Sequence, residues 1–403
     1  MTAVSEQIGN WLAAFTGQRE ASAGWVVELR KAGFERFAEV GFPTTHDEEW
    51  RFTNVAAIAR TTYRVGSADR LVCAPEIVEK METASAASHL GHYAAVNGNP
   101  FVALNTAFID HAVPAAVLRV PANAVVESPI EITHEVPADV TGDPRESLPI
   151  SVHPRTLILV GANAQCSIVE TYKGEGSYFT NAVTEIVVGE NGVVDHYRLQ
   201  QESPEAFHVS STQAQLGRSA TFSTHSISLG GSLVRNDVGA VLSEGTEATL
   251  NGLYIANGTQ HVDHHTVIDH AKAHGTSHEL YKGILDDRAS AVFNGRIIVR
   301  KDAQKTDSKQ TNKNLVLSDD AVINTKPELQ ILADDVRCTH GATIGQLDAE
   351  SMFYLQSRGI NRGDARNLLI YAFAQDVADR IKVAALRDSL ERILFEKFHE
   401  HSH

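Results

Sequence analysis

A repeat of about 28 residues runs through the middle of this sequence and constrains the fold more than any other feature. From about residue 96 to 345, short runs rich in Val, Ile and Thr alternate with Gly, Asn and Asp, as strands alternate with turns. A turn ending in a small residue recurs, so that Ala164, Val193, Ala220 and Ala248 follow one another by 29, 27 and 28 positions. No amphipathic helices separate the strands. The repeat therefore predicts a mainly β protein, a solenoid of stacked coils of the parallel β-helix type.

Helical patterns flank the repeats and divide the chain into regions 1–95, 96–345 and 346–403. Near the amino terminus, "WVVELRKAGFERFAEVGF" has apolar residues at helical spacing and ends at Gly41 and Pro43. A second helix is predicted from Thr45 as N-cap, with the acids of "HDEEW" at the positive end of its dipole.

Two amphipathic helices are predicted in the last region. One begins at Asn361 as the cap, and the other aligns Leu386, Leu390 and Leu394. From the pattern alone, packing on the solenoid and offering a groove to a partner are equally compatible with these helices.

Composition narrows the classes of partner and compartment. The formal net charge of −15 opposes nucleic acid and anionic membrane surfaces, and no basic patch interrupts it. The amino terminus lacks a signal-peptide pattern, and no run of about 18 apolar residues occurs, so a cytoplasmic protein without membrane association is predicted. Cys73, Cys166 and Cys338 are widely separated, which argues against a disulfide framework and against a cluster held by this chain alone.

The densest polar segment is "HVDHHTVIDHAKAHGTSHELYKG", from His261 to Gly283. On a strand, His261, Asp263, His265 and Asp269 would share one face, and His264 and His270 the other. One interpretation is an iron(II) facial triad of His261, Asp263 and a later His340, as in non-haem oxygenases. The favoured interpretation is structural hydrogen bonding inside a solenoid.

Cys338 and His340 lie two residues apart and would face the same side of a strand. They could reach one metal ion or one sulfur species, but two ligands leave a coordination sphere half empty. Completion would have to come from another chain. The alternative is an inward-packed Cys beside a hydrogen-bonded His.

Recognisable catalytic motifs are absent from the sequence. There is no G-x-S-x-G elbow, no G-x-x-x-x-G-K-[ST] and no G-x-G-x-x-G. Nothing in the chain is thus expected to bind ATP phosphates or a dinucleotide in the usual ways.

Several long motifs resemble the SufB/SufD family of iron–sulfur cluster assembly proteins. They include "GFPTTHDEEWRFTN", "FVALNTAFID", "VPANAVVESPIEI", "HVDHHTVIDHAKAHGTSHELYKG", "KTDSKQTNKNLVLS" and "CTHGATIGQLD". The resemblance covers nearly the whole chain. The length and the shortage of cysteines favour the SufD branch over the SufB branch.

This resemblance implies a right-handed parallel β-helix with helical ends and a non-catalytic scaffold role. It implies pairing with SufB through the β-helix, and docking of the ATPase SufC on the carboxy-terminal helices between Gly363 and Phe398. The nascent iron–sulfur cluster would be transient and shared with SufB, with His340 of the "HGAT" motif as a ligand and Cys338 as a less certain one. Two copies could pair through the same edge when SufB is absent. Reduced flavin is a ligand of some wider complexes, and no residue here identifies a site for it.

Overall fold

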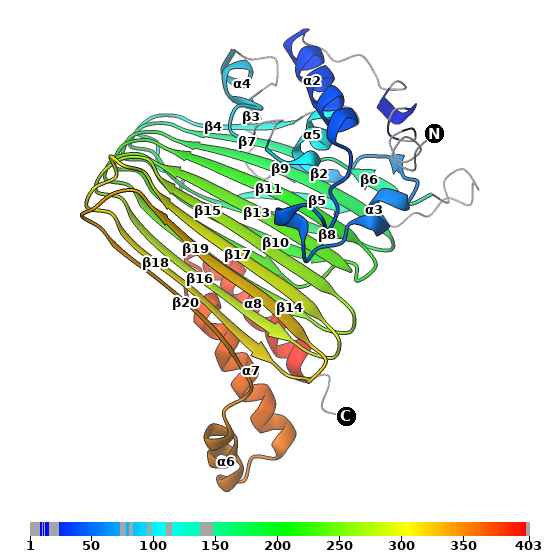
Figure 1. The fold of residues 1–403 in the computed structure, drawn as a ribbon, viewed down its shortest axis with the longest axis vertical. Coiled ribbons are helices and arrows are strands. Elements are labelled where there is room, and N and C mark those ends of the chain that lie inside the picture. The colour runs from blue at the N-terminus through cyan, green and yellow to red at the C-terminus, as the bar shows by residue number, and fades with distance from the viewer. Residues whose placement is uncertain are drawn as a thin grey trace.

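The structure is a parallel β-helix with helices at both ends (Figure 1). It is a computed structural model that describes residues 9, 11, 13–15, 24–72, 78–79, 84–94, 98–109, 115–137 and 148–399. Two sheets, here called A and B, face each other along the molecule. The chain passes from one sheet to the other at each half-turn, so through most of the solenoid each strand pairs with the strand two places further along the sequence.

The two sheets have these strands in spatial order. Sheet A contains β3 (Val78–Glu79), β4 (Ala116–Val120), β7 (Arg155–Val160), β9 (Tyr178–Val188), β11 (Phe207–Leu216), β13 (Leu233–Leu242), β15 (His261–His270), β17 (Ser290–Val299) and β19 (Val322–Ile331), with β6 (Ile150–Val152) and β1 (Arg64–Val65) beside β9. Sheet B contains β2 (Asp69–Val72), β5 (Ile130–Val136), β8 (Gln165–Gly174), β10 (Val193–Glu202), β12 (Thr221–Ser228), β14 (Glu247–Ala256), β16 (Thr276–Leu285), β18 (Asp307–Val316) and β20 (Arg337–Gly345).

The sequence repeat corresponds to one coil of the solenoid. Gln165, Val193, Thr221 and Glu247 stand in register across β8, β10, β12 and β14, so successive coils differ by 28, 28 and 26 residues (193−165, 221−193 and 247−221). The predicted parallel β-helix is therefore confirmed.

Residues with a left-handed backbone conformation lie at the same corner of successive coils. They explain why Asn and Ser recur in the turns of the sequence repeat. Asn163, Asn191 and Ser219 have φ of 57°, 56° and 55°, a conformation that Asn tolerates better than most residues. The Asn side chains also stack. The Asn191 amide donates to Asn163 at 3.1 Å, and the Asn163 amide donates to Asn123 at 2.9 Å.

The core lies between the two sheets, in the lumen of the solenoid. Alternate residues of each strand point inward, and most of those near the coil corners are aliphatic or aromatic, such as Ile168, Phe222, Leu250 and Phe293, all fully buried. As expected, His264 faces this lumen, where its ring lies 5.1 Å from that of Tyr254.

The amino-terminal helices cover the outer face of sheet A. They are α2 (Gly24–Val40), α3 (Ala56–Arg60), α4 (Ala84–His89) and α5 (Pro100–Ala107). Phe37 of α2 and Phe101 of α5 join Phe179 of β9 in one apolar cluster. Since β1 to β3 precede residue 96 and α5 follows it, helix and strand interleave at this end of the solenoid.

The second amino-terminal helix predicted from Thr45 is wrong. That segment makes only one 3-10 turn, η1 (Glu48–Trp50), preceded by Asp47, whose carboxylate accepts from the backbone N–H of Thr44 at 2.7 Å. The segment does not continue as a helix because Glu49 and Thr53 bind side chains of sheet A, as described below.

The carboxy-terminal helices are α6 (Ala349–Ser357), α7 (Arg362–Ala378) and α8 (Ala384–His399), and the last two cover the outer face of sheet B. The predicted cap is confirmed, since the Asn361 side chain accepts from the N–H of Asp364 at 2.9 Å. Packing on the solenoid is confirmed for the last two helices, whose apolar faces meet outward residues of sheet B such as Leu253 and Ile255. Among the described residues, no helix combines the length and apolarity needed to cross a membrane.

We expect Leu390→Ala to loosen α7 and α8 from sheet B. Leu390 is fully buried between α8 and the sheet, and removing such a side chain costs about 2–5 kcal/mol. Hydrogen exchange of the α7 and α8 amides measures the effect. Leu368→Ala is the matched control, because Leu368 is 43% exposed on α7, and it should change protection by less than about 1 kcal/mol. Equal effects of the two substitutions would contradict this packing.

Candidate functional site

The last coil of the solenoid is open. Within the described part of the chain, β19 pairs only with β17 in sheet A and β20 pairs only with β18 in sheet B. Figure 1 shows these two strands at the end of the β-helix away from the amino-terminal helices. Their outer edges present unpaired backbone N–H and C=O groups, which is the ordinary template for adding a strand from another chain.

Cys338 and His340 both lie on β20, on this open coil. They stand in register with Ser308 and Gln310 of β18, which are buried residues of the lumen face. Because neighbours in register on parallel strands point the same way, Cys338 and His340 also face the lumen. The structure thus brings the pair to one face, as the spacing predicts.

The two side chains differ in exposure. Cys338 is half-buried and packs against the lumen core, and this burial, with the nearby Asp307 carboxylate, raises the pKa of its thiol. His340 is exposed. Its imidazole has no hydrogen-bond or ion-pair partner among the described residues, so both ring nitrogens are available to a ligand.

The predicted facial triad of His261, Asp263 and His340 is wrong. His261 and Asp263 lie on β15 of sheet A and face outward, whereas His340 lies on β20 of sheet B. No group of three His, Cys, Asp or Glu side chains able to hold a metal ion occurs among the residues that the structure describes. The oxygenase alternative fails because its ligands lie on different sheets.

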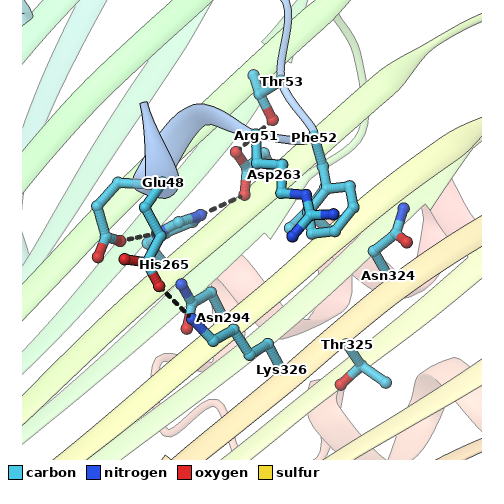
Figure 2. A pocket seen from close by; sticks show the side chains of 12 residues that line it. Glu48, Arg51, Phe52, Thr53, Asp263, His265, Asn294, Asn324, Thr325 and Lys326 are labelled. Carbon is cyan, nitrogen blue, oxygen red and sulfur yellow. Dashed lines mark hydrogen bonds and ion pairs between the residues drawn. The ribbon is translucent and has the colours of Figure 1, made fainter. Parts of the chain in front are cut away.

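The outward face of β15 instead anchors the segment after η1 (Figure 2). Asp263 accepts hydrogen bonds from Thr53 Oγ1 at 2.5 Å and from the Arg235 guanidinium at 2.8 Å, and it pairs with His265 Nε2 at 3.0 Å. His261 Nε2 lies 2.9 Å from the same Thr53 hydroxyl. The structural interpretation of this cluster agrees with these contacts.

Glu49 completes the anchor. Its carboxylate lies 3.3 Å from His265 Nδ1 and accepts from Arg296 at 2.9 Å. The Arg235 guanidinium also lies 3.8 Å from the centre of the Trp50 ring. Beside this network is a pocket of about 300 Å³ lined on its other sides by Phe52, Asn294, Asn324 and Lys326, among others.

Ion pairing sets the charge of this network. Burial opposes protonation of His265, but the Asp263 carboxylate and hydrogen bonds to Asp263 and Glu49 outweigh it and raise the pKa of His265 to about 9. The hydrogen bond with His265, with help from Arg296, lowers the pKa of Glu49 to about 2. At neutral pH His265 is therefore a cation held between two carboxylates.

Sequence reasoning assigned the acids of "HDEEW" to helix capping and missed the contact with His265. The two residues are 216 positions apart (265−49), and nothing local marks their pairing. The available signal was the unusual density of outward polar residues on β15, a face that must be covered by something polar.

The other cysteines lie away from the open coil or outside the description. Cys166 is buried in the lumen, where burial and the Asp195 carboxylate raise its pKa to about 12. A buried thiol of this kind is inert rather than reactive. Cys73 lies outside the described residues.

A second exposed surface lies on the carboxy-terminal helices. On α6, Phe353 and Tyr354 are 73% and 57% exposed, and Phe395 on α8 is 53% exposed. None of the residues of α6 is buried, and Figure 1 shows this helix projecting beyond the solenoid. Large apolar side chains so exposed suit contact with another protein.

Comparison with known proteins finds one family. The domain described as SUF system FeS cluster assembly, SufBD core domain, matches residues 143–373. A SufBD family protein of iron–sulfur cluster assembly from Synechocystis is 36% identical over 91% of this chain and 90% of its own. SufD of Escherichia coli is 35% identical over 60% of this chain and 57% of its own, and SufD of Bacillus subtilis is 25% identical over 75% and 68%.

Docking of the Glu48–Thr53 segment should weaken at alkaline pH. The folded pKa of His265, about 9, is above its ordinary value of 6.5, so the stabilisation by its cation is fully present below about pH 6.5 and disappears as the pH rises through about 9. We expect amide exchange in this segment, corrected for the intrinsic rate, to increase between about pH 7 and pH 10. His265→Gln removes the titrating group and should flatten that dependence; an equally steep rise in this variant would rule out His265 as the cause.

Proposed function

Because the chain belongs to the SufBD family and acts in iron–sulfur cluster assembly, we propose that it is the SufD-like subunit of a SufB–SufC–SufD scaffold. In this proposal it pairs with SufB through the open coil of the β-helix and contributes His340 to the site where the nascent cluster forms. Iron and sulfide are the substrates of this site, and the completed cluster leaves it.

The observation that carries the proposal is the position of His340. It is an exposed imidazole with no partner among the residues described, on the strand whose free edge can accept another chain. Cys338 is the one cysteine beside it, and it is half-buried in the lumen wall. We therefore assign the principal role to His340 and a secondary one to Cys338.

An incomplete ligand set suits a transient cluster. Two side chains on one face cannot fill the coordination sphere of iron, so a stable site requires ligands from SufB. A mixed set of imidazole and thiolate also holds iron less uniformly than four thiolates, which favours release of the product.

Pairing through the open coil is supported by the two free edges together. A partner β-helix could add one strand to β19 and another to β20, which would continue both sheets. Two copies of this chain could use the same edges when SufB is absent. Both assemblies place the partner beside His340.

The carboxy-terminal helices are proposed to bind SufC. The exposed aromatic residues of α6 and α8 provide an apolar surface, while α7 and α8 are fixed to sheet B by their buried faces. ATP hydrolysis would belong to SufC, since this sequence has no nucleotide-binding motif. The chain itself is a non-catalytic scaffold in this proposal. No residue is assigned to flavin.

His340→Ala should abolish most cluster formation by the assembled complex. The experiment is anaerobic reconstitution with ferrous iron and sulfide, followed by absorption and Mössbauer spectroscopy, on the complex with SufB and SufC. His278→Ala is the matched control, because His278 is also exposed but lies on β16, away from the open coil. Unchanged cluster formation by the His340 variant would refute the assignment, and tight iron binding by the chain alone would refute the shared site.

Phe353→Arg should weaken SufC binding by at least about 10-fold, because a charge replaces a large exposed apolar side chain of the proposed surface. Titration of SufC by calorimetry measures the affinity. Val27→Arg is the control, since Val27 is 46% exposed on α2 at the opposite end of the molecule. An equal loss in both variants, or none in either, would place the SufC surface elsewhere.

A further inference from the structure

Directly beneath His340, a column of buried polar side chains extends into the lumen. Glu279 on β16, Gln310 on β18 and His340 on β20 stand in register on three successive strands of sheet B. Glu279 and Gln310 are 4% and 1% exposed. The column thus extends from the exposed imidazole of His340 to two buried side chains.

The orientation of the Gln310 amide is set by Glu279. Gln310 Nε2 donates to Glu279 Oε2 at 2.7 Å. A deprotonated Glu279 only accepts hydrogen bonds, so in that state the amide nitrogen faces Glu279 and the amide oxygen faces elsewhere. Gly295 of β17, on the facing sheet, leaves the space for this amide, because a Cβ atom there would overlap it.

Gln310 Oε1 has no hydrogen-bond partner among the described residues. A buried acceptor left unsatisfied lowers the stability of the fold by about 1–3 kcal/mol. In folded proteins such a group usually has a structural or functional explanation. The next strand in register carries His340, whose ring has an N–H donor and no hydrogen-bond partner within the part of the chain that the structure describes. The unsatisfied acceptor of Gln310 and the N–H donor of His340 are complementary.

We propose that Gln310, oriented by Glu279, is a positioning residue that accepts a hydrogen bond from the ring N–H of His340. This inference rests on the proposed function and deepens it. The bond fixes the tautomer and the rotation of the imidazole, so that the other ring nitrogen presents its lone pair toward the open coil. Histidines that bind metals commonly require such a second partner.

Glu279 has no evident structural reason to be acidic. Among the described residues no cation lies in hydrogen-bond contact with it, and burial raises the pKa of Glu279 to about 7 despite the hydrogen bond from Gln310. An isolated buried carboxylate is costly. The deprotonated carboxylate holds the Gln310 amide nitrogen, and this leaves the amide oxygen as the free acceptor of the column.

The test compares variants of this column by two measurements. Gln310→Leu removes the acceptor, and Glu279→Gln releases the amide orientation. In the exchanged double variant Glu279→Gln/Gln310→Glu, the amide at position 279 donates to the carboxylate at position 310. That carboxylate can still accept a hydrogen bond from His340. Ser308→Ala is the matched control, because Ser308 is equally buried on β18 but lies beneath Cys338.

The first measurement is the tautomer of His340 in the full chain labelled with ¹⁵N-histidine, at mildly alkaline pH. The signal is identified by its loss in His340→Ala. We expect one predominant tautomer in the wild type, in Ser308→Ala and in the exchanged variant, and a mixture in Gln310→Leu and Glu279→Gln. The same populations in the wild type and in Gln310→Leu would overturn the inference.

The second measurement is ferrous iron binding by the complex with SufB and SufC. We expect it to be weakened about 10- to 100-fold in Gln310→Leu and largely restored in the exchanged variant. Normal iron binding by Gln310→Leu would also overturn the inference. Failure of the proposed function has a different signature, in which His340→Ala itself binds iron normally whatever the tautomer result.

Discussion

The backbone ladder between successive coils is the constraint on which the rest of this structure depends. Each strand hydrogen-bonds to the coils before and after it, so only the two end coils have edges that need another partner. At the amino-terminal end, β3 pairs antiparallel with β4 and β2 pairs antiparallel with β5, which covers the first coil in both sheets. At the other end no strand among the described residues pairs with the outer edge of β19 or β20. This asymmetry of the two ends is why we propose that a second chain adds at the last coil.

The stacking of coils also determines which side chains the lumen can hold, because each inward side chain lies next to the side chain in register on the neighbouring strand. Polar groups can then be buried in columns. Glu170 accepts from Thr184 and pairs with His196 Nε2 at 3.1 Å, and although burial opposes ionisation, hydrogen bonds with His134 and His196 hold the pKa of Glu170 well below its usual range. The column that ends at His340 differs from this one, since its uppermost buried acceptor is unsatisfied in the free chain.

Much of the fold could be predicted from local signals, and contacts between coils could not. The 28-residue spacing and the alternation around His264 depend on neighbouring residues, and both are confirmed. The helix predicted at Thr45 is wrong because Glu49 and Thr53 bind β15, a contact that no local pattern records. The facial triad is wrong for a related reason: an H-x-D pair shows which residues share a strand face, but not which sheet carries a later histidine.

The open coil couples assembly to chemistry through its geometry. A strand added to β20 brings the partner's side chains to about 4.8 Å from the row that contains Cys338 and His340. In the proposed complex, the hydrogen bonds that pair the free edge of β20 would also bring the missing ligands to His340. A chain with four ligands of its own would bind iron before its partner arrived. A chain that offers two would need its partner before it could hold a cluster.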